Sequence, residues 1–137
     1  MSTLHLEIVT PEARTFSGSA LSVVIPGVEG ELGILPEHMP LLTQIIPGEI
    51  RVVTEDGAEV NLAVGEGFLE VRPDRVSVLA DMAIMEEEID EKAAEEAVAR
   101  AQQKITEGIL SGEELATVES SLVRSLAQLH VKRRTPH

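Results

Sequence analysis

The hydrophobic residues of this sequence follow two different periods. Between residues 4 and 80 they recur at every second position in short runs, as at Leu4, Leu6 and Ile8, which is the period of half-buried strands. Glycine, proline or aspartate ends most runs, and no helical pattern separates one run from the next. Short strands without intervening helices predict an antiparallel β-sandwich or barrel.

The turn residues divide this region into expected strands and connections. We expect strands at residues 4–9, 15–17, 21–25, 41–46, 49–55, 60–64, 68–71 and 76–79. Asp56 and Gly57 predict a hairpin with a type I′ turn, because both residues tolerate a positive φ. Residues 26–42 are expected to form a shaped loop, since its three prolines oppose a continuing helix or central strand.

From Glu86 onward the apolar residues adopt helical spacing. A first helix is expected to present a narrow stripe, mostly of alanine, at Ile89, Ala93, Ala97, Ala101 and Ile105. A second is expected to pack on it through Leu115, Val118, Leu122, Leu126 and Leu129. Gly108 and Gly112 bracket the turn, with Ser111 as a cap. We therefore predict a β-sandwich domain over residues 1–85 and a helical hairpin over residues 86–137.

An alanine seam removes little apolar area from water, so the hairpin is expected to be only moderately stable. It is either a static hairpin lying on the sheet or a movable arm.

Composition narrows the classes of function. The net charge of −13, without Trp or Tyr and with only two Phe, opposes nucleic-acid binding. The absence of cysteine excludes disulfides and thiolate zinc sites. No apolar run is long enough to span a membrane and no signal sequence is evident, so we expect no direct membrane insertion.

Charge is unevenly distributed in the helical region. No acid follows Glu119, and the last 18 residues carry the cations Arg124, Lys132, Arg133 and Arg134. They form either a solvated tail whose cations suit a helix C-terminus or a docking end for an acidic partner. The acids at Glu86, Glu87, Glu88, Asp90 and Glu91 are interpreted as favouring a helix N-terminus, in preference to a metal or acid–base cluster.

Candidate chemistry is sparse. Gly27, Gly30 and Gly33 suggest a phosphate cradle, but such a loop needs a lysine and a following helix, and its glutamates would repel phosphate. The segment is thus either an ordinary strand connection or a protein contact. The four histidines lack the spacing of a helical metal site, and neither a nucleophile elbow nor a Walker sequence is present. We expect neither catalysis nor a cofactor.

A series of short segments in one order resembles the epsilon subunits of F-type ATP synthases, over most of the chain. These segments are Leu6-Glu-Ile-Val-Thr-Pro-Glu12, Phe16-Ser-Gly18, Val23-Val-Ile-Pro-Gly27, Gly30-Glu-Leu-Gly-Ile34, His38-Met-Pro-Leu-Leu42, Pro47-Gly-Glu49, Gly67-Phe-Leu-Glu-Val71, Val76-Ser-Val-Leu-Ala-Asp81 and Ile89-Asp90.

The resemblance implies a ten-stranded flattened sandwich with a C-terminal helical hairpin. It implies a non-catalytic rotor subunit that couples proton translocation to ATP synthesis and inhibits ATP hydrolysis through its arm, peripheral to the cytoplasmic face of the bacterial membrane. The c-subunit ring would contact Glu29, Gly30, Glu31 and Leu32. The gamma subunit would contact His38, Pro40, Leu41, Leu42 and Thr43. The beta and alpha subunits would receive Arg124, Lys132, Arg133 and Arg134.

Some members of that family bind ATP between the two helices through an Ile-Asp-x-x-Arg-Ala motif. Ile89, Asp90, Arg100 and Arg124 match this degenerate site, whereas Ala93 and Gln128 stand where arginines are expected. Losing two charged contacts to phosphate predicts weak or absent ATP binding.

The alternative function is a free-standing β-sandwich that binds a small ligand or peptide. A glycosidase is a poorer option, because too few aromatic residues are present to grip a sugar.

Overall fold

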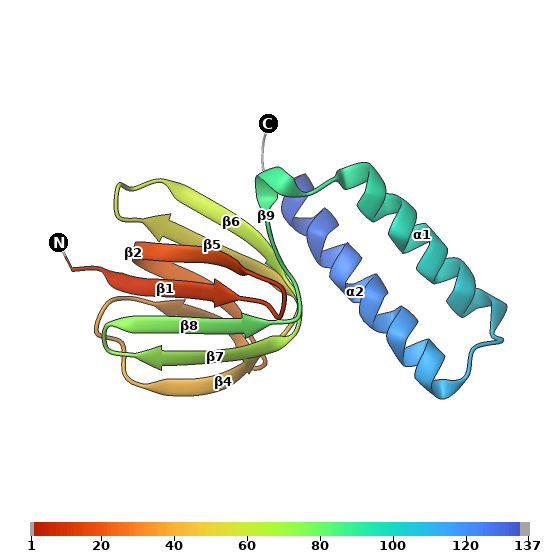
Figure 1. Ribbon diagram of the computed structural model, residues 1–137, viewed down its shortest axis with the longest axis horizontal. Helices are drawn as coiled ribbons and strands as arrows, with labels where there is room; N and C mark the ends of the chain where they lie inside the picture. Colours follow the sequence, from red (N-terminus) through yellow and green to blue (C-terminus); the bar gives the residue numbers. More distant parts are fainter. Residues whose placement is uncertain (1, 135–137) are drawn as a thin grey trace.

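This computed structural model describes residues 2–134, and the side chain of Arg134 lies outside the description. The chain folds into two parts, a β-sandwich and an antiparallel helical hairpin beside it (Figure 1). The predicted sandwich followed by a helical hairpin is confirmed.

The strands form one highly curved sheet that folds over its own core. They are β1 Leu4–Val9, β2 Arg14–Gly27, β3 Gly30–Ile34, β4 Leu41–Ile45, β5 Gly48–Thr54, β6 Glu59–Val64, β7 Gly67–Arg72, β8 Arg75–Ala80 and β9 Ala83–Met85. Their order is β1-β8-β7-β4-β2-β5-β6-β9, with β3 on β2 and a second pairing of β1 with β2. Only β1 and β8 are parallel among the described pairs. The described residues therefore contain nine strands, where the resemblance implied ten.

The predicted alternation is confirmed in β1, where Leu4, Leu6 and Ile8 are at most 1% exposed. Their side chains join a single core with apolar residues from the other strands, among them Val23, Ile25, Ile50, Val52, Leu62, Leu69, Val71 and Val78. Burying each such side chain contributes about 1.5–3 kcal/mol of transfer free energy. The inward-facing apolar side chains of the strands thus hold the sandwich together.

The expectation of one loop from residue 26 to residue 42 was wrong in its first half. β2 continues through Pro26, which pairs with Glu31 of β3, and the two strands form a hairpin. Pro26 is tolerated near the strand end because a missing N–H costs only one ladder bond there. Its carbonyl still accepts a hydrogen bond from the Ile46 amide at 2.9 Å. β2 also joins the two separately predicted strands at residues 15–17 and 21–25.

The hairpin at Asp56 and Gly57 is present, but its turn type differs from the prediction. Gly57 has a positive φ of 87°, whereas Asp56 does not. The Gly57 amide donates to the Thr54 carbonyl at 2.9 Å, as in a type I turn followed by a left-handed glycine. The Asp56 carboxylate accepts from the Thr54 hydroxyl and the Ala58 amide, which hold its pKa below the usual value. Asp56 therefore stabilises the turn with its side chain instead of adopting a positive φ.

A short 3-10 helix, η1 Glu86–Glu88, precedes the hairpin of α1 Glu91–Glu107 and α2 Gly112–Arg134. The three η1 glutamates therefore do not lie in the first turn of α1, and the macrodipole interpretation was wrong for them. Asp90 caps α1 by accepting from the Ala93 amide at 3.0 Å. Gly108 ends α1 with a φ of 70°, and the Ser111 hydroxyl caps α2 by accepting from the Glu114 amide. Gly108 at the end of α1 and Ser111 as the cap of α2 are therefore confirmed.

The apolar stripe of α1 departs from the predicted one at Ala93. Ile89 and Ala101 are buried as predicted and Ala97 and Ile105 are half-buried, but Ala94 is buried in place of Ala93, which is exposed. A row at every fourth residue drifts around a helix of 3.6 residues per turn, so the buried row alternates steps of three and four. In α2, Leu129 is buried as predicted but Leu126 is 44% exposed. Figure 1 shows the reason: α2 lies between α1 and the sandwich, and its two buried sides share the apolar residues.

Candidate functional site

The first candidate contact residues lie at the tip of the β2–β3 hairpin. Glu29, Gly30 and Glu31 are exposed there and Leu32 is half-buried. The Glu31 carboxylate lies 3.6 Å from Arg51 of β5, and Arg51 lies equally far from the buried Glu49. One guanidinium thus restrains the hairpin from the neighbouring strand. The tip is an exposed acidic projection on a rigid base.

The second set, His38, Pro40, Leu41, Leu42 and Thr43, occupies the β3–β4 loop and the first residues of β4. Glu37 starts the bend with a φ of 66°, and its amide donates to the Pro73 carbonyl at 2.7 Å. His38 Nδ1 donates to the Met39 carbonyl at 2.8 Å. This bond holds the ring against its own loop and leaves Met39, 78% exposed, projecting outward.

Leu42 continues into an exposed apolar surface that the sequence analysis missed. Strand register places Phe68 beside Leu79, and Leu79 beside Val9, all on the outward phase of the sheet. Phe68 is 52% and Leu79 is 59% exposed. We call Val9, Leu42, Phe68 and Leu79 the apolar band. Apolar residues on the outward phase of β7 and β8 were the signal that could have revealed it.

A hollow of about 400 Å³ adjoins the band beside Phe68. Its other lining residues include Val28, Gln44 and Ile46 from the β2–β3 hairpin tip and from β4 and its end. The hollow therefore connects the hairpin tip to the apolar band. The apolar band lies on β1, β4, β7 and β8, whereas α2 rests on β5 and β6. Glu31 of the hairpin tip, by contrast, also lines a hollow beneath α2.

An ion-pair cluster beside the band links three strands. Glu7 of β1 lies 2.8 Å from Arg75 of β8 and 3.5 Å from Arg14 of β2. The hydrogen bond from Arg75 holds the pKa of Glu7 below its usual value, aided by the charge of Arg14. The cluster links β1, β2 and β8 on the outward face of the sheet, the face on which the band lies.

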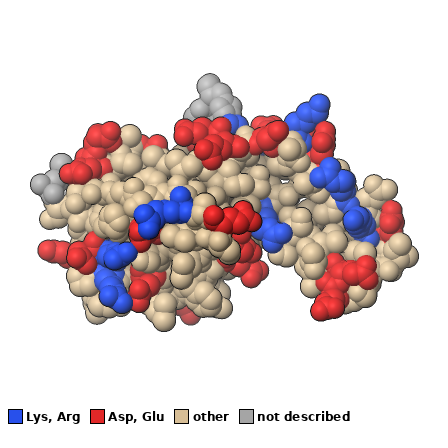
Figure 2. All heavy atoms as spheres, viewed as in Figure 1, with Lys and Arg blue, Asp and Glu red and all other residues tan. Residues whose placement is uncertain are grey.

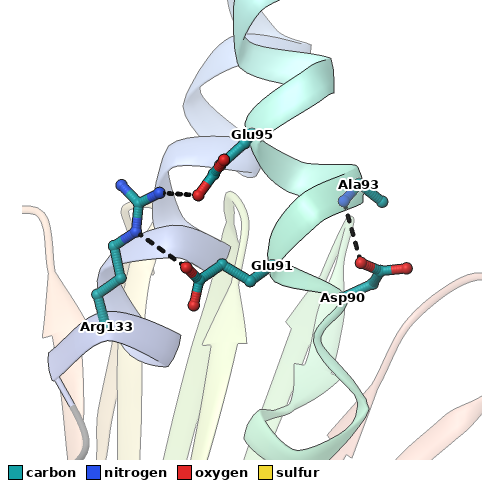
Figure 3. A network of polar contacts seen from close by, with 5 residues as sticks. All are labelled: Asp90, Glu91, Ala93, Glu95 and Arg133. Atoms are coloured by element: carbon teal, nitrogen blue, oxygen red, sulfur yellow. Dashed lines mark hydrogen bonds and ion pairs between the residues drawn. The ribbon is translucent and has the colours of Figure 1, made fainter.

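The predicted docking cations are engaged within the chain. Arg124 lies 3.7 Å from Asp81, and its guanidinium also donates to the Ser120 hydroxyl at 2.8 Å. Lys132 Nζ donates to the Glu86 carbonyl at 3.3 Å. Arg133 contacts both Glu91, at 3.5 Å, and Glu95 of α1 (Figure 3). The side chain of Arg134 lies outside the described residues.

The surface charge agrees with this internal pairing. Figure 2 shows carboxylates scattered over both parts of the visible face, with lysine and arginine side chains in small separate groups among them. Arg124 and Arg133 therefore belong to ion pairs with carboxylates, and Lys132 to a backbone carbonyl contact, instead of forming one basic patch.

The residues of the degenerate ATP site are separated in space. Ile89 is buried, Asp90 caps α1, and Arg100 lines a hollow between the helices. Arg124 lines a different hollow, between α2 and the sandwich. Gln128, at the position where an arginine is expected, donates to the Met82 sulfur at 3.3 Å.

Residues 2–134 contain neither a candidate metal site nor a candidate membrane-spanning helix. No group of three or more His, Asp or Glu residues there is arranged to hold a metal ion. No described helix has the length and apolar character needed to cross a membrane.

The chain matches two family models in succession. The model described as ATP synthase, Delta/Epsilon chain, beta-sandwich domain matches residues 3–86, and that described as the long alpha-helix domain of the same chain matches residues 87–133. A protein of Alkalilimnicola ehrlichii named ATP synthase epsilon chain is 43% identical over 134 residues, covering 98% of this chain and 95% of the relative. A protein of Laribacter hongkongensis with the same name is 44% identical over 130 residues, covering 94% and 92%.

Two solved structures share the fold. One is a chain in a mitochondrial ATP synthase structure of Euglena gracilis, described as OSCP/F1/c-ring in rotational state 1. It has a TM-score of 0.77 and 22% identity, covering 93% of this chain and 79% of that one. The other is a chain in the central stalk/c-ring of Tetrahymena thermophila mitochondrial ATP synthase, with a TM-score of 0.58, 15% identity and 96% coverage of each chain. At these identities the likeness concerns the fold alone.

Proposed function

The chain belongs to the epsilon chains of ATP synthase, and from that premise we propose that it is a non-catalytic subunit of the central stalk of an F-type enzyme. The observation that carries the proposal is the order of the two matched family domains, which together span residues 3–133. The structural neighbours support it, since both come from ATP synthase assemblies that contain a c-ring. The subunit would be peripheral, at the cytoplasmic face of a bacterial membrane.

We propose that the acidic hairpin tip contacts the c-ring through Glu29, Gly30, Glu31 and Leu32. The exposure of its carboxylates and the restraint by Arg51 support a preformed contact. A preformed tip loses little conformational entropy on binding.

The gamma subunit is the proposed partner of the apolar surface that begins at His38, Pro40, Leu41, Leu42 and Thr43. The apolar band extends this surface across β7 and β8, where Phe68 and Leu79 are half-exposed. Apolar patches that remain uncovered on a folded chain commonly mark protein interfaces, and aromatic residues contribute strongly to them.

We further propose that residues 1–85 and 86–137 act as separable units, with the hairpin as an arm that inhibits ATP hydrolysis. Most of the sheet surface beneath α2 supports separability, because its outward residues Glu49, Arg51 and Asn61 are polar, although Ala63 of β6 is buried against the end of the helix. Such a surface can return to water at little hydrophobic cost. In the extended arm, Arg124, Lys132, Arg133 and Arg134 would dock on the beta and alpha subunits after leaving their present partners.

The proposal is tested by purifying a tagged chain from native membranes and from a strain carrying a version without residues 86–137. We expect gamma and c subunits to co-purify with both versions, and ATP hydrolysis to be higher in the complex with the shortened chain. A tagged chain that purifies as a monomer with a small ligand would support the alternative, a free-standing binding module. Equal hydrolysis by the two complexes would contradict the inhibitory arm while leaving the rotor assignment intact.

A further inference from the structure

The contact between α2 and the sandwich is uneven along the helix. In the middle of α2, Val123 and Leu126 are 43% and 44% exposed, although they face strand β5. A hollow of about 410 Å³ separates them from Pro26 and Pro47. Close packing between apolar side chains is therefore incomplete over this stretch, and the dispersion and transfer terms that would hold the helix are small.

The last described turn of α2 is packed differently. Val131 is fully buried, in a small cluster with Ala63 of β6 and Ile89, the residue before the α1 cap. Met82, just before β9, and Ile84, within β9, cover this cluster. It is separate from the main core of the sandwich. The apolar anchoring of α2 is thus concentrated at its C-terminal end.

The two residues after Val131 add polar contacts to other elements. Lys132 donates to the Glu86 carbonyl of η1, and Arg133 lies between Glu91 and Glu95 on the first turns of α1 (Figure 3). Ile89 fixes the start of α1 on the sandwich, so these carboxylates are themselves held in place. Three consecutive residues thereby bind the end of α2 to β6, to η1 and to α1.

We propose that residues 131–133 form a latch that decides whether α2 lies on the sandwich or leaves it. Val131 supplies the apolar anchor, and Arg133 supplies a charged clamp to α1. The remainder of the α2 face rests on a largely polar sheet surface and a hollow, and its polar contacts to the sandwich side are the half-exposed Arg124–Asp81 ion pair and the hydrogen bond from Gln128 to the Met82 sulfur. Releasing the latch therefore strongly favours release of the helix. The latch is a property of the isolated chain and does not depend on assembly into ATP synthase.

The latch gives Arg133 two mutually exclusive uses. While it lies between Glu91 and Glu95 it is not available to another acidic surface. A partner that captures this end of α2 must therefore bind the released state better than the latched state, and its net affinity is reduced by the stability of the latch. Weakening the clamp favours opening of the arm.

The test uses the absence of cysteine in the chain. Ala127 is 8% exposed and lines the hollow beneath α2. The Ala127→Cys variant therefore carries a single thiol under the helix and serves as the background for all further substitutions. The rate at which a reagent labels this thiol is measured under native conditions. The rate reports how often α2 leaves the sandwich. Far-UV circular dichroism in urea verifies that each variant remains folded as a whole.

In this background, Arg133→Glu is expected to raise the labelling rate about two- to fivefold, since exposed ion pairs contribute modestly to stability. Adding Glu95→Arg to Arg133→Glu should return the rate toward that of the background by restoring an opposite-charge pair. Val131→Ala should raise it about tenfold or more, because it empties part of a fully buried site.

Lys104→Glu is the matched control. It changes the net charge by the same amount as Arg133→Glu, but on α1 instead of α2, and Lys104 forms no ion pair among the described residues. It should leave the rate within about 1.5-fold, as expected of a surface substitution away from a specific contact. An equal acceleration by Lys104→Glu, or no reversal by Glu95→Arg, would overturn the clamp. An unchanged rate in Val131→Ala would overturn the anchor.

Discussion

Replacing Gly67 by alanine should destabilise the sandwich strongly. Gly67 lies between β4 and β8, paired with Ile45 on one side and Ala80 on the other. A Cβ atom added there would lie 1.8 Å from the Leu79 carbonyl oxygen and 2.7 Å from the Ala80 Cα. Both are backbone atoms, so no side-chain rotation relieves the overlap. The strands would have to separate locally, by more than 1 Å if the oxygen is to reach ordinary contact.

The expected cost follows from the closeness of the overlap. Forcing an extra carbon into a packed interior costs about 1–3 kcal/mol, and displacement of ladder backbone places Gly67→Ala at the upper end of that range. A loss of about 3 kcal/mol is a large part of a total stability of about 5–15 kcal/mol. For a domain of about 85 residues it lowers the melting temperature by about 12–24 °C.

Far-UV circular dichroism in urea measures the effect, because the chain has neither Trp nor Tyr for a fluorescence assay. Gly33→Ala is the matched control: it is also a strand glycine, with no atom within 4 Å of the added Cβ. Its free energy of unfolding should stay within about 0.5 kcal/mol of the native value. Equal unfolding midpoints for the two variants would refute the close approach of β7 and β8.

Three further predictions concern the surfaces described above. Phe68→Ser combined with Leu79→Ser should reduce co-purification of the gamma subunit but change the free energy of unfolding by less than about 1 kcal/mol, since both positions are half-exposed; unfolding of the variant would contradict a contact role. Arg75→Ala should raise the pKa of Glu7, measured by NMR titration. Because the pKa of Glu7 is lowered in the folded state, its contribution to stability is present above the ordinary glutamate pKa and is lost as pH falls through the folded value. Isothermal calorimetry should detect no micromolar ATP binding, because Ala93 offers no guanidinium to phosphate; a micromolar signal would disprove this.

Local patterns predicted the elements whose residues are fixed by their own neighbours along the chain. The alternation in β1, the glycine at the end of α1 and the cap at Ser111 are of this kind. The β2–β3 hairpin was missed because a proline such as Pro26 usually ends a strand. Near the end of β2, however, the missing N–H of Pro26 removes only one ladder hydrogen bond and costs little free energy. Tertiary placement overrode the local signal.

The contact surfaces were predictable only in part. The residues of the hairpin tip and of the β3–β4 loop came from a family resemblance, and their contacts stay predictions. The apolar band depends on register between β1, β7 and β8, which no local pattern supplies. The clamp at Arg133 was hidden for the same reason, since its two carboxylates lie on the other helix and the sequence showed only a basic end.

The parallel pair of β1 and β8 has a consequence for the order in which the chain folds. β1 can pair with β2 as soon as both leave the ribosome, but its other edge waits for residues about 70 positions later. Such a long-range contact slows folding, because the loop must close before the pairing stabilises it. Until β8 is synthesised, β1 presents an unpaired edge with the apolar side chains of Leu4, Leu6 and Ile8. A nascent chain arrested in this interval is therefore the form most exposed to aggregation and most dependent on chaperones.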